Sequence, residues 1–499
     1  MPGMRIAHLS AEVSPFAKTG GLGDVVGALP KYQAELGNDV SIWMPLYRQV
    51  HEWLGKRGQS PEWVTGPYDV EVGYKRYTVG LLRTFLPGSL VPVYLVGCDP
   101  LFDRPQVYST DAHGRDDGWL RYAVFVRAAL EGMRRTQEVP DVLNAHDWHT
   151  CLAPMALAWD RPRDWHFEKT VTTLTIHNAA YQGMYGPDTF MDLNLPREMA
   201  PGVMWRGALN LMKGGVMSAW AITAVSPTFA HEITTPDGGF GLDPILRHRR
   251  DDLVGILNGI DSQVWNPATD TRIPKTYDRD HLEGKLENRR ALLSMAGMDP
   301  DDRNMVVGIV GRLTEQKGYD LLFPVLDDLL RDGIRFVMLG SGDERLEGLV
   351  HHYGHHARGR FWGYVGFSDD LAHLIEAGCD TFLMPSRFEP CGLSQLYSLA
   401  YGTPPIVRRT GGLNDTVIGY DGWNRDWATG FGFDSPDPHA LRETVRWAHR
   451  CYGDMHLWTQ LVRNGMAQDF SWYRSAEKYL DLYRKLLPRR DGHHVSLHG

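Results

Sequence analysis

Residues 18–24 read KTGGLGD and combine a cation with three glycines. An apolar run of strand length, RIAHLSAEV at 5–13, precedes them, and VVGALPKYQAELG follows with helical spacing as far as Gly37. The glycines are therefore expected on a strand-to-helix turn, where unpaired N–H groups and the positive end of a helix dipole favour a phosphate. Lys18 adds a full positive charge. The alternative interpretation is a tight turn with a solvated lysine.

A second turn of this kind is expected at GRLTEQKG, residues 311–318, directly after the apolar run MVVGIV. It carries Arg312 and Lys317. Two cations on one turn suit a diphosphate, because arginine binds its oxygens in a fork and lysine acts as a point charge. The alternative is ordinary surface charge at a helix end.

The segment PSRFEPCGLSQLYSLAYG, residues 385–402, also follows a predicted strand. It places Glu389 just before a helix that is expected to open at Cys391 and Gly392, which would offer another set of free N–H groups. Alternatively, Glu389 serves only as a favourable charge at a helix N-terminus.

The glycine spacing at 21–27 is close to a dinucleotide fingerprint, so an NAD-dependent oxidoreductase is an alternative function. That fingerprint needs an acid on the ribose, at the end of the second strand. The strand at 40–44 instead runs into Pro45, and Asp39 lies before it. A Walker P-loop does not fit either, since Lys18 precedes the glycines rather than following them.

Histidines cluster in HHYGHH, residues 351–356, and in the pair His146 and His149. Neither group has a cysteine or an acidic partner at the spacing of a zinc site, so a packed or solvated role is expected. We predict neither a metal nor any other cofactor.

Two series of short apolar strands, each alternating with helical segments, must position these residues. Each series predicts a doubly wound parallel sheet, and ligands bind such sheets at the carboxyl ends of the strands. The predicted fold class is α/β, with two Rossmann-like domains whose strand ends face across a cleft. The first series lies at 5–13, 40–46, 92–97, 141–147, 170–178 and 220–227, and the second at 305–313, 335–343, 361–367, 380–387 and 403–412.

The domain boundary is expected near the segment NGIDSQVWNPATD. We predict an N-terminal domain at 1–260 on the acceptor side, with the glycine-rich loop, and a C-terminal nucleotide-sugar domain at 261–470. A helix at 471–487 is expected to cross back to the first domain, and 488–499 to form a loose tail.

Composition sets the context. The chain has 499 residues, of which 43% are hydrophobic, and no stretch approaches the roughly 18 apolar residues of a membrane span. Its five cysteines include no CxxC pair, which favours a reducing compartment, so a cytoplasmic location is expected. The net charge of −9 argues against a nucleic-acid partner, and no membrane partner is expected.

Several motifs together are similar to one family. Seven strings resemble those of bacterial glycogen synthases and plant starch synthases, in the same order. They are KTGGLGDVVGALP, HDWHT, HNAAYQGMYG, ILNGID, GRLTEQKG, SRFEPCGLSQLYSLAYGTPPIVRRTGGLNDTV and TGFGF. The resemblance covers most of residues 4–480. It implies the two-domain GT-B glycosyltransferase fold and transfer of glucose from ADP-glucose to the non-reducing end of an α-1,4-glucan, with release of ADP.

The resemblance also implies roles for individual residues. Arg312 and Lys317 would bind the departing diphosphate, His177 would lie near the transferred glucose, and Glu389 and Asp147 would contact the sugar. These five are the implied catalytic residues. The implied substrate-binding residues are Lys18, Gly20, Gly21, Asp24, Tyr108, Asn178, Asn258, Cys391, Gly392, Leu393, Thr410, Gly411 and Gly412.

An α-linked donor that gives an α-linked product requires retention. Retaining hydrolases use a carboxylate nucleophile. The resemblance instead implies reaction on one face, where the leaving phosphate takes the acceptor proton and fixed groups stabilise the charge that develops. A catalytically silent glucan-binding relative is a further alternative, against which the presence of Lys18, Arg312, Lys317, His177 and Glu389 argues.

Overall fold

The computed structural model describes residues 3–108, 110–111, 113–160 and 163–488. The chain divides into two compact units. The first unit contains the residues up to Asn258 and those from Trp472 onward, and the second is Gly259–Ser471. The helix expected at 471–487 is α19 (Trp472–Leu486), which belongs to the first unit. Most of the tail expected at 488–499 lies outside the described residues.

The first unit is built on a nine-stranded sheet, as far as the described residues show. Seven of its strands pair in parallel, and six of them are the strands that the sequence predicted. The seventh, at the edge, was not predicted. In spatial order the strands are β12 (Leu253–Gly255), β11 (Ala221–Ala224), β7 (Val171–Ile176), β6 (Val142–His146), β1 (Arg5–Leu9), β2 (Asp39–Pro45), β5 (Pro92–Gly97), β4 (Lys75–Phe85) and β3 (Glu62–Val72).

One edge of this sheet departs from the prediction of a purely parallel sheet. Strands β3 and β4 form an antiparallel hairpin, and β4 also pairs antiparallel with β5. Both hairpin strands carry many exposed polar residues, so they lack the continuous apolar runs by which the parallel strands were recognised. A small separate antiparallel sheet joins β8 (Met184–Tyr185), β10 (Ala208–Asn210) and β9 (Met204–Trp205).

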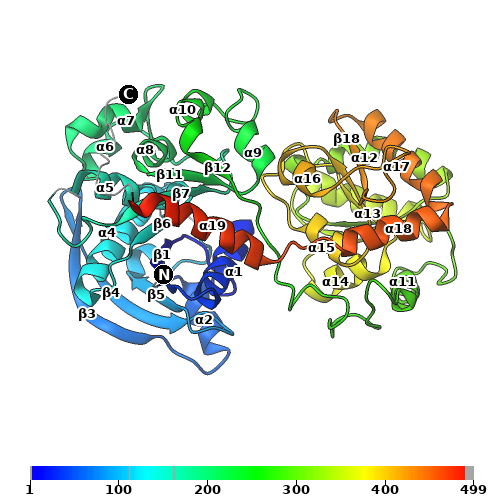
Figure 1. Ribbon diagram of the computed structural model, residues 1–499, viewed down its shortest axis with the longest axis horizontal. Coiled ribbons are helices and arrows are strands. Elements are labelled where there is room, and N and C mark those ends of the chain that lie inside the picture. Colours follow the sequence, from blue (N-terminus) through cyan, green and yellow to red (C-terminus); the bar gives the residue numbers. More distant parts are fainter. Residues whose placement is uncertain (1–2, 109, 112, 161–162, 489–499) are drawn as a thin grey trace. The chain divides into compact units, whose positions relative to one another are not determined.

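Helix α1 (Gly21–Glu35) begins earlier than expected, so two of the three glycines lie in its first turn. Its buried residues recur at helical spacing, from Leu22 through Val25 and Leu29. Helix α19 packs beside α1, and both contribute to one apolar cluster against the sheet (Figure 1). The other helices of this unit are α2 (Arg48–Gly55), α3 (Asp99–Phe102), α4 (Gly118–Thr136), α5 (Leu152–Asp160), α6 (Thr189–Asp192), α7 (Ala200–Val203), α8 (Leu211–Ser218), α9 (Pro227–Glu232) and α10 (Asp243–His248), with the 3-10 turns η1 (Trp148–Thr150), η2 (Arg197–Met199) and η3 (Arg250–Asp252).

The second unit contains a six-stranded sheet in which every described pairing is parallel. The five strands predicted here are confirmed. In spatial order the sheet is β15 (Phe361–Val365), β14 (Arg335–Gly340), β13 (Val306–Val310), β16 (Thr381–Met384), β17 (Pro405–Arg408) and β18 (Phe431–Phe433). Its helices are α11 (Glu283–Met295), α12 (Tyr319–Arg331), α13 (Glu344–His356), α14 (Asp369–Gly378), α15 (Ser394–Ala400), α16 (Gly411–Thr416), α17 (Pro438–Tyr452) and α18 (Met455–Met466), with the 3-10 turn η4 (Glu315–Lys317).

Each parallel sheet has one point where the strand order reverses. In the first unit the chain builds outward from β1 through β2 to one side and then returns to β6 on the other. In the second unit β13 and β16 stand in the same relation. The connections leave such neighbouring strands in opposite directions, which opens a crevice at their carboxyl ends. These two points are where polar side chains have room to gather.

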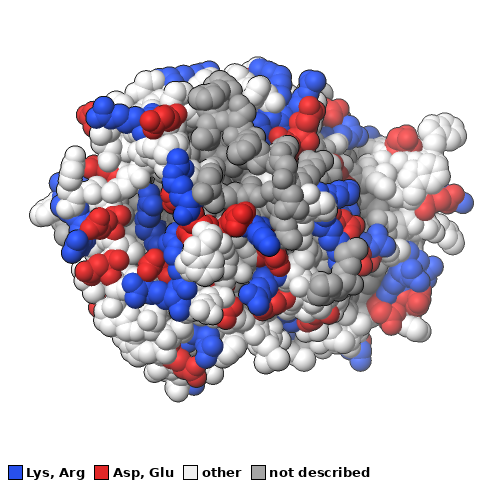
Figure 2. Space-filling model, turned by 60° about the vertical axis from the view of Figure 1, so that its left-hand side comes forward, with Lys and Arg blue, Asp and Glu red and all other residues white. Residues whose placement is uncertain are grey.

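The described surface carries charges of both signs. On the face shown in Figure 2, basic and acidic side chains are intermingled, which is consistent with phosphate recognition by a few local cations rather than by a broad basic surface. Among the described residues, no helix combines the length and the apolar character needed to cross a bilayer.

Replacing Trp472 by alanine should lower the free energy of unfolding by about 3–5 kcal/mol, because this α19 side chain is buried against α1 and the sheet. Urea denaturation followed by circular dichroism measures the change. Lys478→Ala, at an exposed position of the same helix, is the control and should stay within about 0.5 kcal/mol of the parent. Equal midpoints for the two variants would contradict a structural role of α19 in the first unit.

Candidate functional site

A buried carboxylate holds the glycine-rich loop of the first unit. Glu12 Oε2 accepts hydrogen bonds from the backbone N–H groups of Thr19 and Gly20, at 2.5 and 2.9 Å. Its other oxygen, Oε1, accepts the hydroxyl hydrogen of Tyr108 at 2.5 Å. The prediction of unpaired N–H groups available to a phosphate is therefore wrong for Thr19 and Gly20, because both N–H groups donate to the Glu12 carboxylate.

The space around Gly20 and Gly21 is nevertheless open. A Cβ atom added at Gly20 or Gly21 would meet no atom within 4 Å, and neither residue has a positive φ. Neither folding geometry nor internal packing therefore requires glycine at these positions. Lys18 Nζ is paired with Asp24 Oδ1 at 2.7 Å, so the loop cation already has a partner.

Asp147 lies at the carboxyl end of β6, beside the reversal point of the first sheet. Its backbone has φ 55° and ψ −177°, a conformation that costs an L residue about 1–3 kcal/mol. Its Oδ1 accepts hydrogen bonds from the N–H groups of His177 and Asn178, at 2.8 and 3.4 Å. Burial raises the pKa of Asp147 to about 7, although these N–H groups oppose the shift. The structure thus brings together three predicted site residues.

His177 follows β7 at the same edge, and its ring contacts a second histidine. Its Nε2 lies 2.9 Å from Nδ1 of His146, on β6. Burial lowers the pKa of His177 to about 3, so the ring is neutral near pH 7. His149 stacks on Tyr108, and no group of side chains able to hold a metal occurs within the described ranges.

Asn258 lies farther along the same sheet, after the edge strand β12. It is buried, and its Oδ1 has no hydrogen-bond partner among the residues that the structure describes. Among the described residues, no hydrogen bond or ion pair joins it to the group around Asp147. The structure therefore brings Asn258 to the predicted sheet edge without connecting it to the other site residues.

In the second unit, Arg312 and Lys317 lie on the connection from β13 to α12, at the reversal point of the sheet. Lys317 Nζ pairs with Glu389 Oε2 at 2.6 Å, and the hydroxyl of Ser386 donates to the same oxygen at 3.0 Å. Arg312 is exposed and makes no ion pair with any described residue. This edge therefore presents one available guanidinium and one ion pair between a half-buried lysine and a buried carboxylate.

The helix after Glu389 begins at Ser394, not at Cys391 and Gly392 as predicted. Gly392 has φ +73°, which a helix does not accommodate, so Cys391, Gly392 and Leu393 form the loop that leads into α15. The expected free N–H groups of a helix start are therefore absent from Cys391.

The predicted residues Thr410, Gly411 and Gly412 pack closely against this loop. Gly411 has φ +44°, and a Cβ there would lie 1.9 Å from the carbonyl oxygen of Glu389. Gly412 donates its N–H to that same oxygen at 3.1 Å. These two glycines thus hold the backbone of Glu389 in place, which is a supporting role and not a sign of ligand contact.

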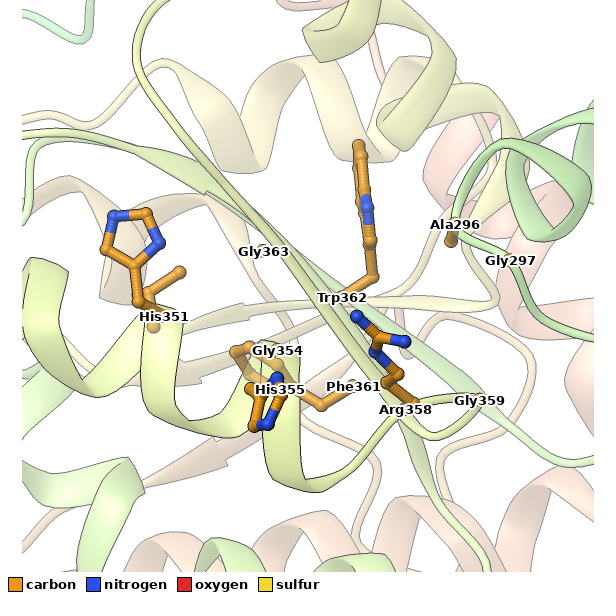
Figure 3. A pocket seen from close by; sticks show the side chains of 11 residues that line it. Ala296, Gly297, His351, Gly354, His355, Arg358, Gly359, Phe361, Trp362 and Gly363 are labelled. Atoms are coloured by element: carbon orange, nitrogen blue, oxygen red, sulfur yellow. The ribbon is translucent and has the colours of Figure 1, made fainter.

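A cavity of about 560 Å³ in the second unit lies elsewhere. It is lined by His351 and His355 of α13, Arg358, and the first residues of β15, including Trp362 (Figure 3). The start of β15 belongs to the amino edge of the sheet, opposite the edge of Arg312 and Glu389. Because ligands of open parallel sheets bind at the carboxyl edge, this cavity is not assigned to the candidate site.

Three side chains at these edges escaped the sequence analysis. Glu12 follows β1, Ser386 follows β16, and Phe367, 83% exposed, follows β15. The available signal was position, since each lies near the end of a predicted apolar run. The sequence does not show which partners they contact, namely Thr19, Gly20 and Tyr108 for Glu12, and Glu389 for Ser386.

Comparison with known proteins identifies the relatives of the chain. The starch synthase catalytic domain family matches residues 5–248, and the family of group 1 glycosyl transferases matches residues 296–464. Glycogen synthase 2 of Geobacter metallireducens is 40% identical over 494 residues, covering 98% of this chain and 100% of that protein. The glycogen synthase of Thioalkalivibrio sulfidiphilus is 42% identical over 496 residues, covering 97% and 100%.

Solved structures agree with the GT-B fold expected from the sequence. The catalytic domain of starch synthase IV from Arabidopsis thaliana, bound to ADP and acarbose, has a TM-score of 0.87 and 32% identity, covering 98% of this chain and 100% of that one. Sucrose-phosphate synthase from Thermosynechococcus elongatus, at 16% identity and a TM-score of 0.60, shares the fold, with 97% and 99% covered. The chain therefore belongs to the glycogen synthase and starch synthase family of GT-B glycosyltransferases.

Proposed function

We propose that this chain transfers glucose from ADP-glucose to the non-reducing end of an α-1,4-glucan, with retention of configuration and release of ADP. The observation that carries the proposal is the gathering of charged and polar side chains at the carboxyl edge of each sheet, near its strand-order reversal. Family membership over the full chain supports it, and argues against an NAD-dependent oxidoreductase. The five cysteines are free, so we also propose a reducing, cytoplasmic setting.

We propose that the first unit serves the acceptor and the glucosyl group, together with the glycine-rich loop, and that the second unit binds the nucleotide. The exposed Phe367 ring lies at the carboxyl edge of the second sheet, and an aromatic face there suits stacking on a purine base. The relative from Arabidopsis was solved with ADP, which is consistent with this assignment.

Charge must be stabilised as the anomeric bond breaks. The departing diphosphate gains negative charge. We assign Arg312 as the cation that stabilises this charge, and Lys317 as a second group that donates a hydrogen bond to the diphosphate. Lys317 keeps one N–H on Glu389, and an ammonium group has three donors, so it can bind a phosphate oxygen without leaving its partner. We assign four residues of the glycine-rich loop to binding of the sugar donor, ADP-glucose: Lys18, Gly20, Gly21 and Asp24.

The glucosyl group needs positioning rather than attack. Neutral His177 is a hydrogen-bonding group, because protonation of its ring is suppressed at working pH. The carboxyl groups of Asp147 and Glu389 are each held in place by two hydrogen-bond donors of the chain. We therefore assign both carboxyl groups to binding the hydroxyls of the sugar. The leaving phosphate then accepts the proton of the glucan hydroxyl, on the face where the new bond forms.

The reaction is tested by incubating the full chain with radiolabelled ADP-glucose or UDP-glucose and glycogen, with and without EDTA. We expect label in the polymer, faster from the adenine donor, and unchanged by EDTA because Arg312 and Lys317 face the diphosphate. Equal or faster transfer from UDP-glucose would overturn the donor assignment. Loss of activity in EDTA that magnesium or manganese restores would overturn the assignment of those two cations.

Arg312→Ala should lower kcat by about 10²–10³, more than it raises the donor KM, because it removes a preorganised charge from the transition state. Steady-state kinetics at saturating glucan measures both constants. Arg303→Ala is the matched control: this exposed arginine precedes β13 at the amino edge and should leave kcat unchanged. A folded Arg312→Ala enzyme that changes only KM would assign Arg312 to ground-state binding alone.

Gly20→Ala should lower kcat/KM for the sugar donor by about tenfold or more, because the new methyl group blocks approach of the ligand to the neighbouring Gly21 N–H, a hydrogen bond worth ~1.4 kcal/mol. The free energy of unfolding should change by less than about 0.5 kcal/mol, since the new methyl group meets no neighbour. Gly55→Ala, equally open at the end of α2, is the control. Unchanged donor kinetics in the Gly20 variant would show that the open backbone binds no ligand.

A further inference from the structure

His177 and three side chains behind it form a continuous line of hydrogen bonds through the first unit. His177 Nε2 lies 2.9 Å from His146 Nδ1, and His146 Nε2 lies 3.0 Å from His8 Nδ1. His8 Nε2 lies 2.7 Å from Gln33 Oε1, on α1. The side chains of His8, His146 and Gln33 are fully buried, and only His177 reaches the surface, at 9% exposed. We call these four residues the imidazole chain.

Chemistry gives the imidazole chain a direction. The amide oxygen of Gln33 can only accept, so His8 must carry its hydrogen on Nε2. A neutral imidazole has one donor and one acceptor nitrogen, so His8 Nδ1 accepts from His146 Nε2–H, and His146 Nδ1 accepts from His177 Nε2–H. His177 is left with a bare Nδ1, for which the described residues offer no hydrogen-bond partner.

The three rings stay neutral because they are buried. Burial lowers the pKa of His8 to about 4 and that of His146 well below its usual range, with the neighbouring imidazoles acting in the same direction on His146. A charged ring would have two donors and would leave one of them facing a donor of its neighbour. Neutrality and direction are thus consistent along the whole chain.

Gln33 lies on the buried face of α1, and its backbone carbonyl accepts from the Asn38 side chain at 2.9 Å. Its amide oxygen faces His8 Nε2 at 2.7 Å. Its amide nitrogen is buried and has no hydrogen-bond partner among the described residues. The direction of the imidazole chain follows from the oxygen, and not the nitrogen, facing His8.

We propose that the imidazole chain fixes the tautomer of His177, so that its bare Nδ1 accepts a hydrogen bond from a hydroxyl of the glucosyl group. This rests on the proposed function for the identity of the ligand only. His8, His146 and Gln33 are positioning residues, which act through His177. A site of this kind selects a ligand that donates a hydrogen there, and rejects one that lacks it.

The tautomer is measured directly on the full-length protein without ligand. With ¹⁵N-labelled histidine, long-range ¹H–¹⁵N spectra distinguish protonated from bare ring nitrogens, and loss of a signal in a His177→Ala variant assigns it. We expect hydrogen on Nε2 and none on Nδ1 of His177, and a mixture of tautomers in Gln33→Met. Hydrogen on Nδ1 in the parent protein would overturn the proposal, whatever reaction the enzyme catalyses.

Kinetics tests the consequence. Gln33→Met keeps the side-chain volume but removes the acceptor, and should lower kcat by about 10–100-fold with little change in donor KM, as loss of groups that orient metal-bound histidines does. Gln33→Glu keeps an acceptor oxygen and should recover most of kcat. Thr170→Val, which removes a buried hydrogen bond at the amino edge of the same sheet, is the control and should retain kcat.

The two failures are distinguishable. Equal kcat values for Gln33→Met and Thr170→Val would overturn the positioning role. If the parent enzyme fails to use ADP-glucose while the expected tautomer is observed, the proposed function is overturned and the fixed tautomer stands. Replacing each hydroxyl of the glucosyl group of ADP-glucose in turn by fluorine identifies the partner of His177 Nδ1, because fluorine cannot donate a hydrogen bond. If no replacement lowers kcat, the acceptor role of Nδ1 is overturned.

Discussion

The candidate site depends on one topological constraint, the reversal of strand order in each parallel sheet. Between β1 and β6, and between β13 and β16, the connections leave in opposite directions and the carboxyl ends stay uncovered. Backbone polar groups and side chains at such ends need partners. In the first unit, Glu12 and Asp147 accept from backbone N–H groups of nearby loops, and in the second unit Lys317 pairs with Glu389. The chemistry-bearing residues of each unit thus collect where its sheet leaves space.

Much of this arrangement was predictable, because strand ends are visible as apolar runs that stop at polar residues. The strands beside Arg312 and Glu389 are as predicted, and so is the location of both residues on turns after them. The hairpin β3–β4 was not predictable from apolar runs, since polar residues at exposed positions interrupt its apolar ones. Partnerships such as Glu12 with Thr19, or Lys317 with Glu389 across 72 positions, depend on tertiary structure that residue spacing does not contain. Polar residues at core positions, His8 within a strand and Gln33 on an apolar helix face, were the overlooked signal.

The site cations differ in how they are held. Lys18 and Lys317 each have a carboxylate partner at hydrogen-bond distance, whereas Arg312 has none among the described residues. A cation with a fixed partner keeps its position but contributes less net field, and an unpartnered one contributes its full charge. The first unit therefore presents one positioned ammonium group, and the second unit presents another together with a guanidinium that is available to an incoming anion.

Glu12 has a thermodynamic consequence for ligand binding. Because its carboxylate already holds the N–H groups of Thr19 and Gly20, the glycine-rich loop is ordered when the chain folds. Ordering one residue of flexible backbone costs about 1–2 kcal/mol of conformational entropy at 25 °C. For these two residues that cost belongs to folding, so a calorimetric titration at this loop should lack the entropy penalty that disordered phosphate-binding loops show when they close.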